Sequence, residues 1–372
     1  MNNGIDNLRK YEHLLHGKRI GLITNPSGVT NKLEMTADIL ARHFKLTALF
    51  GPEHGIRGDA QAGASIEDSR DSVLDIPVFS LHGKTKRIPH EAFDLFDVLA
   101  YDIQDVGARF YTFIYPLAMA MEDAAKAGKP VVIFDRINPL GGDVTEGILL
   151  DTKNFSSFVG MYPMPTRYGL TVGEFARYIN STFRIGCELS VIPCEPHSRK
   201  TLFSQTKLQW ISPSPNIPTF DTALAYIGTC IFEGTNISEG RGTTRPFELI
   251  GAPFIDAQKL VARMELHHVP GIAWRPVHFT PMYSKYSGEL CHGVQLHILS
   301  HRIARPFEAG LWLCDEIRHL YPADFSFKNE TLSRLLGTES FILGRESAEE
   351  IIQRAYHDSN CFKEESKEFW LY

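Results

Sequence analysis

The chain has 372 residues, of which 43% are hydrophobic and 22% are charged, and its formal net charge is −6. These values are typical of a soluble globular protein that is long enough for two domains of ordinary size. An acidic chain without clustered basic residues lacks the surface that binds phosphate backbones, so nucleic acid is excluded as an expected partner.

The cysteines and the N-terminal residues give expectations about the compartment. The six cysteines contain no CxxC pair and no zinc-type spacing, which indicates isolated reduced thiols. No basic start followed by an apolar run opens the sequence, and no run of about 18 apolar residues could span a bilayer. We therefore expect a cytoplasmic protein without membrane insertion. A protein whose leader had been removed would show the same sequence and would be secreted or periplasmic.

Helical patterns alternate with apolar runs in the first part of the chain. Apolar residues at helical spacing predict an opening amphipathic helix over residues 5–15. Strands buried on both faces are predicted by apolar runs at 19–24, 46–50, 98–103 and 131–135, with a fifth at 77–81. Helices are expected at 35–44 and 117–127. This alternation predicts βαβ units and a parallel, Rossmann-like sheet in an α/β fold.

The pattern changes along the rest of the chain. Residues 136–226 are rich in proline and are expected to form loops around one helix at 171–182. Beyond them we expect a strand at 291–297 and helices at 257–266, 306–320 and 348–356. The predicted organisation is a Rossmann-like catalytic domain over residues 1–226 and a smaller α+β domain over 227–372 that completes a cleft.

Polar residues follow the predicted strands at the point where each strand ends. They include Asn25, Glu53, Asp102, Asp105 and Asn138, held among glycines and prolines. Open parallel sheets bind ligands beyond the carboxyl ends of their strands. The sequence therefore predicts a site at this edge of the sheet.

Glu53 is the first candidate for a catalytic group. It lies in a loop that Pro52 stiffens and that Gly55 and Gly58 leave free to turn. Glycoside cleavage needs a carboxylic acid that protonates the leaving oxygen, which Glu53 could supply. The alternative is a structural role in which Glu53 caps a helix or pairs with Arg57.

Asp102 and Asp105 are the candidates for a second carboxylate. The chain is expected to turn by Gln104, so both side chains could reach the crevice, where one would act as a base or stabilise positive charge on a sugar. Either residue could instead be a turn carboxylate that accepts hydrogen bonds from backbone N–H groups.

Residues 233–244 form a third candidate, a glycine-punctuated loop with acidic, amide and hydroxyl side chains that could bind a sugar. Motifs for other chemistry are absent: the sequence has no GxGxxG, Walker A, HExxH or GxSxG pattern. The histidines are scattered without ligand spacing. We therefore expect neither a cofactor nor a metal.

Taken together, six ordered motifs resemble the NamZ-type exo-β-N-acetylmuramidases, a family formerly catalogued as a domain of unknown function. The motifs are residues 21–28, 50–58, 101–111, 135–142, 214–219 and 233–248. The resemblance extends from about residue 18 to the C-terminus. It implies a Rossmann-like domain joined to a smaller domain, with the active site between them.

The resemblance also implies an activity and a set of site residues. Members release N-acetylmuramic acid from the non-reducing end of peptidoglycan fragments, and the family's proposed catalytic residue corresponds to Glu53. Asp102 or Asp105 is then expected to be the partner carboxylate, with Glu233 and Glu239 as the next candidates. Substrate binding is expected at Asn25, His54, Arg57, Arg109, Tyr111, Asn138, Asn216, Glu233, Asn236, Glu239 and Arg241.

Several alternatives remain open from the sequence. The mechanism could be retaining, inverting or assisted by the substrate's acetamido group. The lactyl carboxylate of muramic acid needs a cationic partner, for which Arg57, Arg109, Arg241 and Arg245 are candidates. A non-catalytic muropeptide-binding protein is one rival function, since fold does not fix function. An amidase or esterase acting on muramyl peptides is another. The expected partner is a small saccharide in each case, and the oligomeric state is left open.

Overall fold

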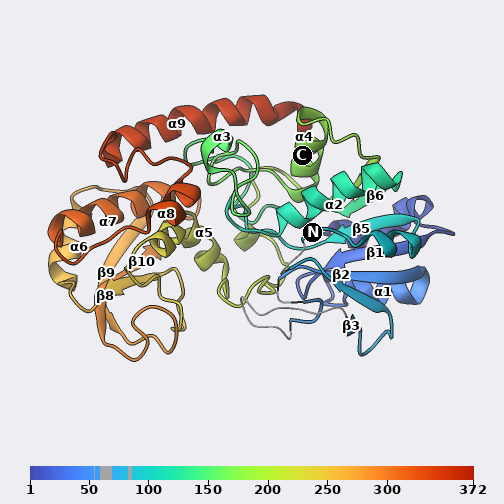
Figure 1. Cartoon of the computed structure of the whole chain (residues 1–372), viewed down its shortest axis with the longest axis horizontal. Coiled ribbons are helices and arrows are strands. Elements are labelled where there is room, and N and C mark those ends of the chain that lie inside the picture. The colour runs from blue at the N-terminus through green and yellow to red at the C-terminus, as the bar shows by residue number, and fades with distance from the viewer. Residues whose placement is uncertain (54, 59–68, 83–85) are drawn as a thin grey trace.

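The computed structural model describes residues 1–53, 55–58, 69–82 and 86–372. Figure 1 shows two lobes side by side, with one long helix lying across the top of both. His54, expected to bind substrate, lies outside the described residues.

The first lobe is built on a seven-stranded sheet in the order β3-β4-β2-β1-β5-β6-β7. All neighbouring strands pair in parallel except the short edge strand β3, which is antiparallel to β4. The predicted parallel sheet is confirmed. The strands are β1 (Arg19–Thr24), β2 (Lys45–Gly51), β3 (Ser69–Arg70), β4 (Pro77–Ser80), β5 (Val98–Asp102), β6 (Val131–Phe134) and β7 (Leu189–Ile192).

Alternate side chains of the central strands face two different hydrophobic cores. Ile20 and Leu22 belong to the core formed with η1 (Gly4–Leu14) and α1 (Thr36–His43). Ile23, Leu99 and Tyr101 belong to the core formed with α2 (Ile114–Ala127) and α4 (Val172–Thr182). Because successive strand side chains point to opposite faces, helices on both sides require the uninterrupted apolar runs seen in the sequence.

The helices of this lobe largely follow their sequence signals. α2 ends where glycine was expected to stop it, since Gly128 takes a left-handed conformation with φ 64°. The opening helix is of the 3₁₀ type and is kinked at Tyr11. Three short helices complete the lobe: η2 (His90–Asp94), α3 (Thr152–Phe155) and η3 (Phe203–Gln205). Strand β7 was not predicted, because its four residues include Ser190 and give no clear period.

The second lobe contains a three-stranded antiparallel sheet in the order β8-β10-β9. Its strands are β8 (Leu249–Ala252), β9 (Ile272–Phe279) and β10 (Cys291–Ile298). Its helices are α5 (Phe220–Thr229), η4 (Cys230–Gly234), α6 (Ala257–Glu265), α7 (Pro306–Leu320), α8 (Asn329–Leu336) and α9 (Ala348–Glu365). The short helix η5 (Ser366–Phe369) follows α9 and packs against α4 of the first lobe. The predictions of β10, α6 and α7 are confirmed, and α9 continues beyond its predicted end at residue 356. Strands β8 and β9 and helices α5 and α8 were not predicted. Residue 226, the predicted domain boundary, lies inside α5.

Helix α9 carries the chain from the second lobe back to the first (Figure 1). The C-terminal residue Tyr372 then hydrogen-bonds through its hydroxyl to Asp135 Oδ2 at 2.8 Å and to the backbone N of Cys194 at 2.9 Å. The chain end is thereby tied to the carboxyl ends of β6 and β7. Among the described residues, no helix is both long enough and apolar enough to cross a membrane.

Candidate active site

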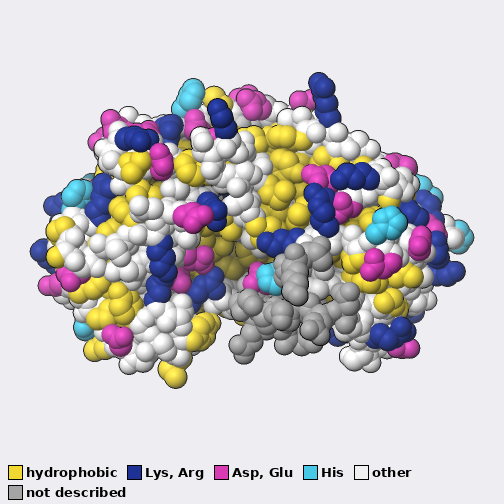
Figure 2. Space-filling view, viewed as in Figure 1, with side chains coloured by type: hydrophobic (Ala, Val, Ile, Leu, Met, Phe, Trp, Pro, Cys, Tyr) yellow, Lys and Arg dark blue, Asp and Glu magenta, His cyan; other side chains and the backbone are white. Residues whose placement is uncertain are grey.

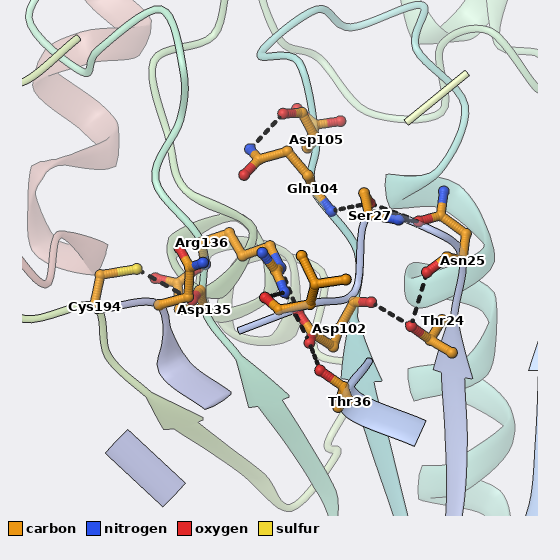
Figure 3. Close-up of polar contacts among 12 residues, drawn as sticks. Thr24, Asn25, Ser27, Thr36, Asp102, Gln104, Asp105, Asp135, Arg136 and Cys194 are labelled. Atoms are coloured by element: carbon orange, nitrogen blue, oxygen red, sulfur yellow. Dashed lines mark hydrogen bonds and ion pairs between the residues drawn. The ribbon is translucent and has the colours of Figure 1, made fainter. Parts of the chain in front are cut away.

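The carboxyl ends of β1 and β5 lie side by side, with Thr24 paired to Asp102 in register. The segments that follow them are joined by hydrogen bonds, as Figure 3 shows: Gln104 N donates to Ser27 Oγ at 2.9 Å, and Ser27 Oγ donates to Asn25 Oδ1 at 2.5 Å. Asn25 Nδ2 donates to the carbonyl of Pro213 at 3.2 Å. Asn25 is fully buried. It holds the loops together and does not face a ligand, contrary to the prediction.

Asp102 is withdrawn from the crevice into a buried ion pair. Its Oδ1 accepts from Arg136 Nε at 2.5 Å, and its Oδ2 accepts from Arg136 Nη2 at 2.9 Å and from the hydroxyl of Thr36. The side chain is 0% exposed. Figure 3 shows Asp102 between Arg136 and Thr36. With both oxygens engaged inside the protein, Asp102 positions Arg136 and cannot reach a sugar. Its predicted catalytic role is not supported by this geometry.

Asp105 is the second carboxylate that the strand end supplies. Its Oδ2 accepts from the backbone N of Gly107 at 2.5 Å and from the hydroxyl of Tyr168, whereas Oδ1 has no hydrogen-bond partner within the described residues. Gly107 has φ +76° and packs against the Asn138 side chain, so only glycine fits there. Burial raises the pKa of the Asp105 carboxyl to about 6, although its hydrogen bonds from Tyr168 and Gly107 oppose the rise. Perturbed carboxylates of this kind are common in active sites.

Tyr111 links Asp105 to Glu53. Burial raises the pKa of the Tyr111 hydroxyl well above its ordinary value, the negative charges of Asp105 and Glu53 raise it further, and a hydrogen bond with Ser214 opposes the rise. Glu53 follows β2, while Asp105 and Tyr111 follow β5, and these two strands lie on either side of β1. Both carboxylates act electrostatically on the Tyr111 hydroxyl, and the binding of one sugar by these residues stays a prediction.

The second lobe contributes a chain of alternating charges. Arg241 donates to Glu233 Oε1 at 2.5 Å and lies 3.4 Å from Glu239 Oε1. Glu239 Oε2 accepts from Lys285 Nζ at 2.8 Å, and Lys285 also donates to the carbonyls of Phe232 and Ile237. The loop 233–244 therefore brings Glu233, Glu239 and Arg241 together as predicted.

Tyr226 connects this charged chain to the first lobe. Its ring lies 6.2 Å from that of Tyr111 in an edge-to-face arrangement. Burial is the main cause that raises the pKa of the Tyr226 hydroxyl. Nearby ionisable groups, among them Glu233, raise this pKa further, and the positive charge of Arg241 opposes the rise. The two groups of charged residues thus lie on either side of a pair of tyrosines. Figure 2 shows a hollow between the lobes, with apolar side chains at its base and charges of both signs along its walls.

Three other predicted residues have structural roles. Arg109 is 0% exposed and donates to the carbonyls of Ile148, Met164, Leu335 and Leu336. Asn138 binds the backbone of Leu140 and Leu170, and Asn236 binds that of Asp324 and Ser326. These side chains saturate the backbone groups around them. Their predicted substrate contacts stay predictions.

Arg57 and Asn216 complete the predicted set. Arg57 is held by Asp71 at 2.8 Å and by Asp38 at 3.3 Å, so its charge is already balanced by two carboxylates. Asn216 accepts a hydrogen bond from the hydroxyl of Tyr283 at 3.2 Å and lies in the same segment as Ser214. Asn216 is therefore at the cleft, and Arg57 belongs to the wall behind it.

Several residues of the site were not predicted. They are Tyr168, Ser214, Tyr226, Tyr283 and Lys285, and none of them lies in a recognisable pattern except Ser214, which opens the 214–219 motif. Within the described ranges, no three His, Cys, Asp or Glu side chains are grouped to hold a metal ion.

Comparison with known proteins identifies the family. Residues 20–221 match the model of the N-terminal part of the exo-β-N-acetylmuramidase NamZ, and residues 224–372 match that of its C-terminal part. The chain belongs to the NamZ family. It is 45% identical to the peptidoglycan β-N-acetylmuramidase NamZ of Bacillus subtilis (strain 168), over 99% of this chain and 91% of that protein.

Two solved structures are similar to this NamZ family member along its whole length. Both are crystal structures of DUF1343 family proteins from Bacteroides fragilis NCTC 9343. One has a TM-score of 0.92 at 35% identity and the other a TM-score of 0.82 at 31% identity. Each comparison covers 100% of this chain and 98% of the other. The two-lobed architecture is thus shared across the family.

Proposed function

We propose that this protein is an exo-acting glycosidase that releases N-acetylmuramic acid from the non-reducing end of peptidoglycan fragments. The observation that carries the proposal is the grouping of Glu53 and Asp105 around Tyr111 at the strand ends. Two carboxyl groups beside one sugar are what glycoside hydrolysis needs. The family relationship supports the same activity.

In the proposed mechanism, Glu53 protonates the glycosidic oxygen as the bond to the leaving sugar breaks. Water then forms the new bond to C1 of N-acetylmuramic acid, and the proton that it gives up restores the acid form of Glu53. Asp105 supplies negative charge that stabilises the oxocarbenium-like transition state. Its burial makes that charge effective, since electrostatic interactions are stronger where water is excluded. The Tyr168 hydroxyl and the Gly107 N–H fix Oδ2, and Oδ1 is buried without a hydrogen-bond partner among the described residues.

Arg241 is the proposed partner of the lactyl carboxylate that distinguishes muramic acid from glucosamine. Of the four arginines considered, Arg109 is enclosed by carbonyl groups, and Arg245 is half exposed beside Glu248. All three side-chain nitrogens of Arg57 are engaged, by Asp71, Asp38 and the Met35 sulfur, whereas Arg241 contacts its two glutamates through Nη2 and Nε only. Arg241 is 26% exposed and lies next to Tyr226. A guanidinium can bind a further carboxylate through its remaining N–H groups.

One experiment tests the proposal against its rivals. The protein is incubated with the disaccharide N-acetylmuramyl-β-1,4-N-acetylglucosamine and with its peptide-bearing form, and the products are identified by mass spectrometry. Free N-acetylmuramic acid, absent with Glu53→Gln, is the expected result. A released peptide with intact disaccharide would indicate an amidase, and unchanged substrate in both samples would leave only a binding protein.

A further inference from the structure

Tyr283 lies on the loop between β9 and β10 and presents an aromatic ring at the edge of the cleft. Tyr283 is 54% exposed. Its hydroxyl donates a hydrogen bond to Asn216 Oδ1 at 3.2 Å, which fixes the position of the hydroxyl. Asn216 is buried and comes from the segment before α5. The hydroxyl therefore joins the loop to the rest of the cleft, while much of the ring remains open to solvent.

The loop that carries Tyr283 is firmly anchored. Lys285, two residues later, uses three N–H groups on Glu239 and on the carbonyls of Phe232 and Ile237. Met282 N donates to the carbonyl of Gly242 at 2.9 Å. Gly242 has φ +81°, and a Cβ there would lie 2.5 Å from the carbonyl oxygen of Tyr283, so the approach of the two backbones requires glycine. The ring is consequently held in place before any ligand arrives, which lowers the entropic cost of binding.

The neighbours of Tyr283 indicate on which side of the cleaved bond its ring lies. Gly242 follows Arg241, the proposed partner of the lactyl group, and Asn216 lies two residues from Ser214 in the same segment. Tyr283 is 54% exposed, so its ring lies at the surface next to these segments. An exo-acting enzyme encloses the terminal sugar and leaves the remainder of the chain toward solvent. Tyr283 is thus placed on the solvent side of the scissile bond.

We propose that the Tyr283 ring is the platform for the sugar on the leaving-group side of the bond, an N-acetylglucosamine unit or its equivalent. This inference rests on the proposed function. A pyranose ring has a face of C–H groups that packs on an aromatic ring, and tyrosine combines this apolar face with a polar tip that holds its orientation. Nδ2 of Asn216, which has no hydrogen-bond partner in the described part of the chain, can donate to a hydroxyl or acetamido oxygen of the same sugar.

The platform is tested by comparing two substrates that differ only in the leaving group. The muramyl disaccharide places a sugar on Tyr283, whereas N-acetylmuraminyl fluoride has a leaving group that cannot reach it. Tyr283→Ala should lower kcat/KM for the disaccharide about tenfold, which corresponds to about 1.4 kcal/mol, and leave kcat/KM for the fluoride unchanged. Tyr283→Phe retains the ring and should stay close to the wild type. Tyr356→Ala removes an exposed tyrosine of α9 and is the control.

A binding measurement keeps the two proposals separate. Calorimetric titration in a Glu53→Gln background should show about tenfold weaker binding of the disaccharide after Tyr283→Ala, and equal binding of N-acetylmuramic acid. Equal losses on both substrates, or no loss on either, would overturn the platform. A wild-type protein that cleaves neither substrate would instead contradict the proposed function, and the titration would still decide whether Tyr283 contacts the second sugar. Thermal unfolding of each variant identifies any that fails to fold.

Discussion

Arg136 donates two hydrogen bonds to Asp102 at the carboxyl end of β5, from Nε to Oδ1 at 2.5 Å and from Nη2 to Oδ2 at 2.9 Å. The same Nη2 donates to the carbonyl of Val29, so one guanidinium ties together the segments after β1, β5 and β6. These are the segments that position the candidate site. The ion pair of Arg136 and Asp102 therefore stabilises the segments that position the candidate site.

Removing one member of this pair should destabilise the fold. Arg136→Met leaves the Asp102 carboxylate buried without its counter-charge, a situation that costs about 3–5 kcal/mol. The double variant Arg136→Met with Asp102→Leu should lose less, because neither charge remains. Urea denaturation measures the difference. Arg70→Ala, which breaks the exposed pair with Asp75, is the control and should leave the midpoint close to wild type. Similar losses in all three proteins would show that the pair does not support the strand ends.

Asp105 should govern the acidic side of the pH profile. The ionised carboxylate is the proposed active form, and its pKa is about 6. The ionised carboxylate therefore dominates above pH 6 and is protonated as the pH falls below 6. We expect kcat/KM to rise as the pH increases through about 6. Asp105→Asn should abolish this rise and lower kcat by about 10²–10⁴-fold. Asp135→Asn is the matched control, because burial also raises the pKa of Asp135 to about 6, yet Asp135 is bonded to Thr171 and Tyr372 away from Tyr111. A rise that persists in Asp105→Asn would assign it to another group.

Glu53 should be needed most where the leaving group is poor. A sugar hydroxyl leaves only when it is protonated, whereas fluoride leaves readily as an anion. Glu53→Gln should therefore lower kcat on the muramyl disaccharide by about 10²–10⁴-fold and have a much smaller effect on N-acetylmuraminyl fluoride. Release of fluoride and of reducing sugar gives the two rates. Equal losses on both substrates would remove Glu53 from the role of general acid.

Arg241 should select for muramic acid. Replacement by alanine removes the proposed partner of the lactyl carboxylate, and charge-assisted hydrogen bonds of this kind contribute about 1.5–3 kcal/mol. We expect kcat/KM on the muramyl substrate to fall by about 10- to 100-fold. On the corresponding glucosaminide, which has no lactyl group, any residual activity should not fall. Arg245→Ala, which removes the half-exposed neighbour bonded to Glu248, is the control. A loss of the same size on the glucosaminide would contradict the assignment.

The sequence by itself determined five of the seven described strands of the first sheet, all except β3 and β7, and the loop that carries Glu53. Buried strands such as 19–24 and 98–102 must be apolar on both faces, and consecutive residues of each strand show this pattern directly. The resemblance of ordered motifs added the family. Strands β7 and β8 have only four residues each and lacked such a signal, because their burial depends on neighbours distant in sequence.

Only the tertiary structure decided which polar residues face the cleft. Arg109 and Arg241 are the same residue type in two family motifs, yet Arg109 is enclosed by carbonyls that include those of Leu335 and Leu336, 226 and 227 residues away in the chain. Asp102 and Asp105 lie three residues apart, and Arg136 binds both oxygens of the first, while Oδ1 of the second is buried without a hydrogen-bond partner among the described residues. A polar side chain binds whatever partner the fold brings to it, and burial makes that pairing obligatory. Local sequence cannot specify partners that come from other segments.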